Sequence, residues 1–266
     1  MESKSICYTI ITSGYDNLIE PKIITPNWKY ICFTDNVEAI TSTTWEIRPI
    51  PSEIQEDDTL SGVKKQRVLK INPYKYIKDE NLSLSVYVDA NLEINCNLDE
   101  LSEKYKDSDI IVPIHPQRNC IYREARVILA SRRDTKENIE PQLKFLEEEK
   151  FPHNFHLNET NVLIRRKTEK IEEMMNLWET TLRKYSHRDQ MSFNYAEWKT
   201  NVKVTDLPKN ENRKKLFLWR KHGTKSTISK QLRVRILPNR TAKPIHTPPL
   251  TTRKKIIIER LSKHPL

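Results

Sequence analysis

The chain has 266 residues and only three glycines, where a usual share is roughly 7%. The glycines stand far apart, which excludes a P-loop and a GxGxxG dinucleotide fingerprint, since each needs several glycines in one short loop. No apolar run approaches the roughly 18 residues of a membrane span. The four cysteines form no CxxC pair, which argues against a cysteine zinc site and a disulfide framework and favours a reduced, cytoplasmic protein.

The positive charge of the chain is concentrated at its C-terminal end. Residues 209–266 contain 17 Lys and Arg but only two Glu, a net charge of +15. Residues 1–208 contain 29 basic and 34 acidic residues, a net charge of −5. We therefore expect a mildly acidic domain at 1–208 and a basic C-terminal extension at 209–266.

Strands and helices alternate along the first 200 residues. Apolar, β-branched stretches predict strands at 6–12, 29–35, 44–49, 83–90, 109–114 and 161–166. Helical periodicity, with Pro or polar stops, predicts helices at 64–72, 98–105, 121–131, 141–150, 167–185 and 189–198, and a loop at 50–63. This order favours an α/β domain with a mostly parallel sheet flanked by helices.

The segment VYVDANLEI, residues 86–94, places two oxygen-bearing side chains at the end of a buried strand. In an open α/β sheet, ligands bind at the carboxyl ends of the strands. Asp89 and, two residues on, Asn91 could hold a divalent cation with hard oxygen ligands, and such a cation would neutralise a diphosphate. The alternative is a strand that simply ends in a polar turn.

The order of the segments resembles the TOD/MUCI-type glycosyltransferase-like family of the GT-A nucleotide-sugar transferases. A more distant likeness is to the glycogenin-type retaining transferases. The matching stretches are YTIITSGYDN (8–17), YICFTDN (30–36), RVLKINPYKYI (67–77), VYVDANLEI (86–94), HPQRNCIYREA (115–125), ETNVLIRRK (159–167) and HRDQMSFNY (187–195). The resemblance implies a GT-A-like catalytic domain over 1–208.

The same resemblance implies roles for residues at the matching positions. The donor nucleotide and diphosphate would contact Thr12, Tyr15, Asp16, Asp35, Arg67 and Lys70. A divalent cation, Mn²⁺ or Mg²⁺, would be held by Asp89, Asn91 and His222, the first two in the place of a DxD motif. A DQ pair beside the reacting sugar would be Asp189 and Gln190. The acceptor or donor-sugar pocket would include His115, Arg118, Tyr122, Glu124 and Asn161.

Plainer structural roles stay open for several of these residues. Asp35 could belong to an ordinary turn, and Arg67 and Lys70 could lie on a solvated helix face. Asp189 stands just before a helix, where Asp is favoured as an N-cap. Asn91 is neutral, so this pair would bind a cation more weakly than two carboxylates.

The expected activity is transfer of a hexose from a nucleoside-diphosphate sugar to a hydroxyl of a glycan or lipid-linked acceptor, as in polysaccharide biosynthesis. The likeness to glycogenin-type enzymes favours retention of configuration. One alternative is a nucleic-acid-binding protein that uses the basic extension, although few aromatic residues are interleaved there. Another is a sugar-nucleotide-binding hydrolase of the same fold.

The extension also suggests a location. In RKKIIIERLSK, residues 253–263, three apolar side chains could share one side of a short helix flanked by basic residues. A basic amphipathic segment binds anionic membrane surfaces, which would place the protein at the inner face of the membrane. The alternative is a solvated tail packed on the catalytic domain, and salt-sensitive binding to anionic vesicles distinguishes the two.

Overall fold

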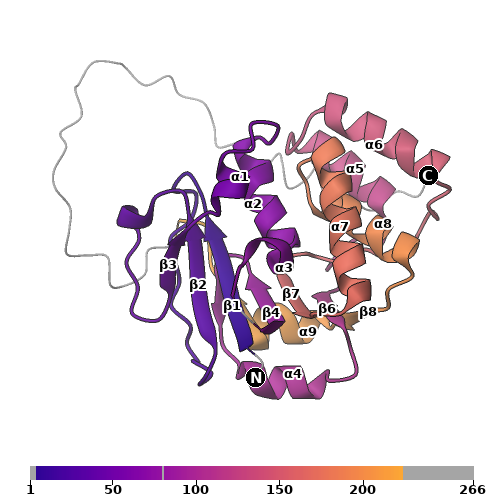
Figure 1. The fold of residues 1–266 in the computed structure, drawn as a ribbon. Helices are drawn as coiled ribbons and strands as arrows, with labels where there is room; N and C mark the ends of the chain where they lie inside the picture. The colour runs from indigo at the N-terminus through magenta and orange to yellow at the C-terminus, as the bar shows by residue number, and fades with distance from the viewer. Residues whose placement is uncertain (1–3, 80, 224–266) are drawn as a thin grey trace, which may run out of the picture.

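Seven strands form one sheet in the order β3-β2-β1-β4-β7-β6-β8 (Figure 1). The computed structural model describes residues 4–79 and 81–223. The strands of the sheet are β1 Lys4–Ile11, β2 Lys29–Thr34, β3 Glu46–Pro49, β4 Leu82–Val88, β6 Ile110–Pro113, β7 Val162–Arg166 and β8 Val204–Leu207. All neighbours are parallel except that β7 runs antiparallel to both β4 and β6. The predicted α/β class with a mostly parallel sheet is confirmed.

The helices lie close to where the periodicity predicts them. They are α1 Ser52–Gln55, α2 Gly62–Ile71, α3 Pro73–Tyr76, α4 Leu98–Lys104, α5 Ile121–Ala130, α6 Lys136–Glu148, α7 Glu169–Lys184, α8 Gln190–Thr200 and α9 Lys209–Glu211, with short turns η1 Val37–Ala39 and η2 Asn212–Leu216. Two predictions were wrong in detail. The expected loop at 50–63 contains α1, and α6 begins at Lys136 and not at Pro141. A proline inside a helix costs one backbone hydrogen bond, and the buried face of α6 continues across it.

The two faces of the sheet are packed by alternate residues of each strand, as the two-residue period of a strand requires. In β1, Ile6, Tyr8 and Ile10 join the cluster formed with α2 and α7, whereas Cys7 and Ile11 join the cluster on the opposite face. A third cluster lies among α5, α6 and α8. The cysteine side chains are all buried and unpaired. The sheet is therefore covered on both faces, and its carboxyl edge remains for a site.

Residues 209–223, which the sequence assigns to the basic extension, pack on the rest of the domain. Strand β9, Phe217–Trp219, pairs antiparallel with β5, Leu92–Ile94, directly after the VDAN segment. Phe217 is fully buried in the cluster on that face. The amphipathic segment at 253–263 lies outside the described residues. Within the described part, no helix is long and apolar enough to cross a membrane.

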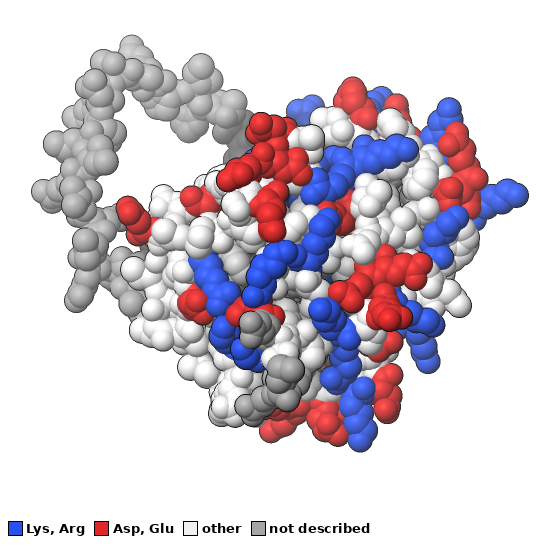
Figure 2. Space-filling view, viewed as in Figure 1, with Lys and Arg blue, Asp and Glu red and all other residues white. Residues whose placement is uncertain are grey.

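Acidic and basic side chains are interspersed on the described surface shown in Figure 2. This mixture agrees with the nearly balanced charge of residues 1–208. The surplus of positive charge counted in the sequence comes from residues after 208.

A buried arginine fixes the C-terminal end of α2. Arg165, on β7, donates from Nη1 to the carbonyls of Lys70 and Ile71 at 3.1 and 2.8 Å. Its Nη2 donates to the Tyr8 hydroxyl at 2.6 Å, and that hydroxyl donates to the Lys70 carbonyl at 2.8 Å. The last carbonyls of a helix have no partner within the helix, and a cation there also favours the helix dipole. Arg165 therefore holds in place the helix that carries Arg67 and Lys70.

We expect Arg165→Met to destabilise the fold by about 3 kcal/mol, because it leaves buried helix-end carbonyls without donors. Arg166→Met, the adjacent arginine, whose side chain is only partly buried and donates to the Ser102 carbonyl, is the matched control. Urea unfolding of the three chains measures the difference. Equal midpoints for the two variants would contradict the role given to Arg165.

Candidate active site

Three adjoining cavities line the carboxyl edge of the sheet. The β1–β2 cavity, of about 220 Å³, shares Ile11 and Asp16 with the central cavity, of about 590 Å³. The central cavity shares Arg67, Asp89 and Arg188 with the polar cavity, of about 310 Å³. The three form one groove, because each shares lining residues with the next. This edge is where an open α/β sheet binds its ligands.

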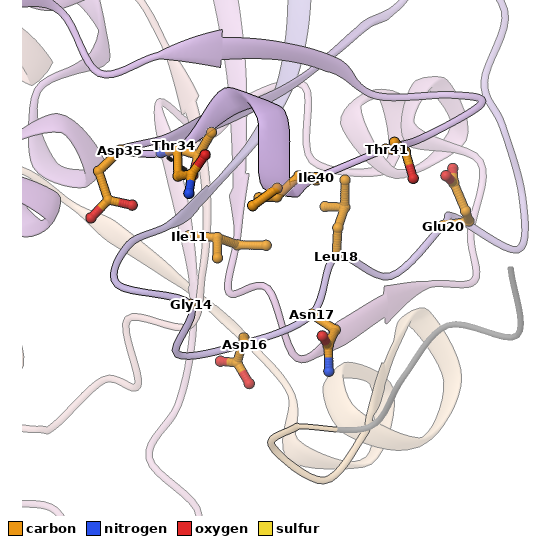
Figure 3. A pocket seen from close by; sticks show the side chains of 12 residues that line it. Ile11, Gly14, Asp16, Asn17, Leu18, Glu20, Thr34, Asp35, Ile40 and Thr41 are labelled. Atoms are coloured by element: carbon orange, nitrogen blue, oxygen red, sulfur yellow. Dashed lines mark hydrogen bonds between the residues drawn. The ribbon is translucent and has the colours of Figure 1, made fainter. Parts of the chain in front are cut away.

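The β1–β2 cavity has an apolar middle and polar ends. In Figure 3, Ile11, Leu18 and Ile40 lie between Asp35 at one end and Glu20 at the other. Asp35 directly follows β2, and its carboxylate accepts from the Ser13 backbone N–H at 2.8 Å. The turn after β1 is thereby tied to the end of β2, so Asp35 has a structural role as well as its place in the wall of the groove.

The central cavity is lined by most of the residues that the sequence predicts to bind the donor nucleotide and by all three predicted metal ligands. Its lining consists of Ile10, Ile11, Thr12, Ser13, Tyr15, Asp16, Ser61, Gly62, Val63, Gln66, Arg67, Tyr87, Asp89, Ala90, Asn91, His187, Arg188 and His222. Tyr15 is 72% exposed, and its ring packs edge-to-face on the His222 ring, with 5.4 Å between the ring centroids. An exposed aromatic ring at the mouth of a cavity offers a flat surface to a ring of a ligand.

The polar cavity is built around a buried ammonium group. Lys70 is 2% exposed, and its Nζ lies 2.6 Å from Asp189 Oδ2 and 3.6 Å from Asp89 Oδ1. Thr160 donates to Asp189 Oδ2 at 2.9 Å, and Arg67 Nε lies 3.7 Å from Asp189 Oδ1. Lys70 therefore joins the carboxylate at the end of β4 to the carboxylate at the start of α8.

Asp189 does not act as a helix cap. It holds the N-cap position of α8, but its side chain makes no capping hydrogen bond. Burial opposes its ionisation, yet the charges of Lys70 and Arg67 and the hydrogen bond from Lys70 hold the pKa of Asp189 well below its usual range. The Asp189 side chain is therefore an anion that lines the polar cavity. The helix-capping role that the sequence also allowed does not explain the position of this side chain.

The loop after β6 forms another wall of the polar cavity. Arg118 Nε contacts the Glu124 carboxylate directly, and the Arg118 backbone N–H donates to His115 Nδ1 at 2.8 Å. All three side chains line the cavity. Tyr122 does not: its ring stacks on His153 at 4.1 Å, and its hydroxyl donates to the Phe151 carbonyl. Of the site residues predicted from sequence, Tyr122 alone is absent from the cavity walls among the described residues.

Asn161 and Gln190 complete the polar cavity. Asn161 precedes the antiparallel strand β7, and its carbonyl accepts from the Asp89 backbone N–H at 2.9 Å, which joins the start of β7 to the end of β4. Its buried Oδ1 has no hydrogen-bond partner within the described residues. Gln190 Nε2 donates to the Asn158 carbonyl at 2.6 Å. The Gln190 amide is therefore held through its nitrogen, and the buried Asn161 Oδ1 is left for a ligand.

The three predicted metal ligands all line the central cavity. His222 Nδ1 lies 3.0 Å from both carboxylate oxygens of Asp16, and its Nε2 lies 3.5 Å from Asn91 Nδ2. A carboxylate on Nδ1 fixes the tautomer that leaves Nε2 free to bind a metal. Counting only His, Cys, Asp and Glu, the described residues contain no group of three arranged for a metal ion. Asp89, Asn91 and His222 offer a cation one carboxylate, one amide oxygen and one imidazole, but the Asn91 amide turns its nitrogen toward His222 here, so its oxygen would have to turn to bind a cation.

Sequence reasoning missed several residues of the groove. Arg188 and His187 directly precede Asp189 inside the HRDQMSFNY stretch, so that motif contained a signal for them. Thr160 precedes Asn161 in the ETN stretch. Arg133 follows a helix in an ordinary polar turn, and no pattern in the sequence marks it.

The fold and the groove define an α/β protein with a charged ligand site at the carboxyl edge of its sheet. The family model of the TOD1/MUCI70 glycosyltransferase-like domain matches residues 1–222, and the chain belongs to this family. The family resemblance drawn from the sequence is confirmed. None of the curated proteins matches the chain.

Several solved structures of glycosyltransferases match the chain at low sequence identity. Mouse xyloside xylosyltransferase 1, in its apo form, has a TM-score of 0.48 and 9% identity over 77% of this chain and 85% of that chain. The bifunctional glycosyltransferase WbbM, also apo, has a TM-score of 0.48 and 12% identity, over 78% of this chain and 39% of that chain. Core-mannan synthase A of Aspergillus fumigatus, in a Mn/GDP form, has a TM-score of 0.41 and 9% identity, over 74% of this chain and 70% of that chain.

The lowered pKa of Asp189 predicts a pH-dependent contribution to stability. A carboxyl whose pKa is lower in the folded chain stabilises the fold above its unfolded pKa of about 4, and this contribution is lost as the pH falls. We expect Asp189→Asn to reduce the unfolding free energy at pH 7, and the deficit to shrink between about pH 4 and pH 2.

Urea unfolding across this pH range measures the deficit, with Asp58→Asn, at an exposed position outside the groove, as the control. A deficit that does not change with pH would show that Asp189 is not ionised in the folded chain.

Proposed function

We propose that the chain transfers a hexose from a nucleoside-diphosphate sugar to a hydroxyl of a glycan acceptor, with retention of configuration. The observation that carries the proposal is the continuous groove, in which the central and polar cavities adjoin at Arg67, Asp89 and Arg188. A nucleoside-diphosphate sugar has the same order of parts: a nucleoside, a diphosphate and a sugar. Membership of a glycosyltransferase-like family supports this assignment.

The nucleoside would occupy the β1–β2 and central cavities. Tyr15 offers an exposed ring, and Thr12 and Asp16 lie in the same turn after β1. Asp35 lines the β1–β2 cavity, and both of its oxygens accept from the Ser13 N–H; because the residue is exposed, base or ribose donors would share these oxygens with Ser13. These cavities adjoin the proposed cation site at Asp16, which also contacts His222.

A divalent cation would be held by Asp89, Asn91 and His222, with Asp16 orienting the imidazole. When bound, the cation would supply positive charge to the diphosphate as it leaves. The chain contributes charge of its own beside that place, because Arg67 and Lys70 are fixed there by Asp189. The single carboxylate among the three ligands predicts weaker cation binding than a site with two.

The sugar would occupy the polar cavity, next to Asp189 and Gln190. As the bond from the anomeric carbon to the diphosphate breaks, positive charge develops on the sugar ring, and a fixed carboxylate stabilises it. Asp189 is ionised and held by Lys70 and Thr160, so it needs no rearrangement to act in this way. Gln190, whose Nε2 is bound to the Asn158 carbonyl, has Oε1 left for the sugar or the acceptor hydroxyl.

The test is incubation with a panel of nucleotide sugars, with and without glycan acceptors, with Mn²⁺, Mg²⁺ or EDTA. We expect a glycosylated product whose anomeric configuration, read by proton NMR, equals that of the donor. Release of free sugar without any transfer to an acceptor would favour the hydrolase alternative. A panel without turnover or nucleotide binding would overturn the proposal.

Within this assay, Asp89→Ala should lower turnover on the order of 10²-fold or more, because it removes the charged member of the cation site at the diphosphate. Asp107→Ala, which removes an exposed carboxylate outside the groove, is the matched control. Circular dichroism and the melting temperature show whether each variant is folded. Wild-type turnover in folded Asp89→Ala would contradict the role of this residue.

A further inference from the structure

We propose that Arg188 binds the diphosphate of the donor and, together with Arg67, stabilises it as the leaving group. This assignment rests on the proposed function and adds a residue to it. Arg188 lies in the connection between α7 and α8, directly before Asp189.

The position of Arg188 follows from the two cavities it lines. Arg67, Asp89 and Arg188 are the residues common to the central cavity and the polar cavity, so they surround the passage between them. In a nucleoside-diphosphate sugar, the diphosphate is the part that joins nucleoside and sugar. A donor that spans both cavities must therefore place its diphosphate beside these three residues, of which two are arginines.

The surroundings of the Arg188 guanidinium also favour binding of an anion. Arg67 has an ion-pair partner in Asp189, whereas none is found for Arg188 among the described residues. The buried Nε of Arg188 has no hydrogen-bond partner there either. Burial, and the positive charges of Arg67 and Arg133, lower the pKa of Arg188 despite the attraction of Asp189. The charges of Asp189 and Glu124 therefore compensate the buried guanidinium only in part, and a bound anion would lower the remaining cost of its burial.

The backbone around Arg188 is rigidly held. Its N–H donates to Ser186 Oγ at 3.0 Å, and Ser186 donates in turn to the Asp134 carboxylate. Its carbonyl accepts from the Met191 N–H at 2.8 Å, and the next carbonyl, that of Asp189, accepts from the Trp178 indole at 2.8 Å. The backbone that carries Arg188 is therefore held in place before the donor arrives, which limits how far its guanidinium can move from the passage, and such preorganisation makes charge stabilisation effective.

The chemistry needs only a fixed positive charge at this position. The bond between the anomeric carbon and the β-phosphate oxygen breaks, and its electron pair stays on that oxygen. The anomeric carbon forms a bond to the acceptor oxygen, and the acceptor proton passes to the phosphate or to solvent. The negative charge gained by the diphosphate is met by the forked N–H donors of Arg188 and Arg67, which suit phosphate oxygens. Arg188 itself gives up no proton.

The test measures binding of pyrophosphate, GDP, UDP, GMP and UMP by calorimetry, with Mn²⁺ present. We expect Arg188→Gln to weaken binding of pyrophosphate and of the bound diphosphate nucleotide about 10- to 100-fold, as for lost charged hydrogen bonds. Binding of the matching monophosphate should change less than about 3-fold. Arg188→Lys should lie between, because it keeps the charge and loses the fork.

Two further variants separate position from overall charge. Arg132→Gln, at an exposed arginine outside the cavity walls, should bind all the ligands as the wild-type chain does. Arg133→Gln changes an exposed arginine of the polar cavity that is away from the passage, and it should affect pyrophosphate less than Arg188→Gln. Melting temperatures verify that each variant is folded, and Arg188→Lys serves if Arg188→Gln is not.

Equal losses for monophosphates and diphosphates, or equal effects of Arg133→Gln and Arg188→Gln, would overturn the assignment while leaving the proposed function intact. The same holds if Arg188→Gln binds as wild type. A wild-type chain that binds neither pyrophosphate nor any nucleotide would overturn the proposed function and this assignment with it.

Discussion

The site depends on one buried ammonium group. Lys70 lies on the last turn of α2 with almost no exposure to solvent, and a buried charge is tolerated only when it is closely paired. Its partner is Asp189 at 2.6 Å, and Asp89 lies at 3.6 Å. Lys70 and these two carboxylates together join α2, the end of β4 and the start of α8, three elements that are far apart in the sequence. The charges in the groove are therefore set by the fold before any ligand binds.

The surrounding contacts support this pair. Arg165 and Tyr8 hold the carbonyl end of α2, which sets the depth at which Lys70 enters the cavity. Thr160 shares Asp189 with Lys70, so the carboxylate keeps one orientation. Such a site carries little apolar surface and many fixed charges, an arrangement suited to stabilising charge that develops on a ligand. It is a poor arrangement for stability alone, since apolar side chains of similar volume would often stabilise the fold as well or better.

Much of the fold follows from the sequence because its strands carry a strong two-residue apolar alternation and its helices a clear period. The clustering of Thr12, Asp35 and Asp89 was predictable, because each directly follows a parallel strand and such ends meet at one edge of a sheet. The antiparallel direction of β7 was not, since its apolar run looks the same in either direction. Strand β9 was hidden inside a stretch whose dominant signal is positive charge.

Within the site, too, several side-chain contacts could not be predicted from the sequence. His222 contacts Asp16, 206 positions earlier in the chain, and only the tertiary fold brings them together. The motif predicts that Asp189 belongs to the site. Whether its side chain caps α8 or pairs with Lys70 depends on the tertiary contacts around it, including the hydrogen bond from Thr160. Tyr122 has an aromatic polar side chain in a distinctive stretch, yet α5 turns it toward His153 and away from the groove.

The most direct test of the central role of the buried pair is a double-mutant cycle on unfolding free energy, with Lys70→Met, Asp189→Asn and the double variant. Removing either partner alone leaves a buried charge poorly compensated, and each single change should cost about 3–5 kcal/mol. The double variant should cost less than the sum of the two by at least about 2 kcal/mol. Strictly additive costs would show that Lys70 and Asp189 are not coupled, and would contradict the account of the site given above.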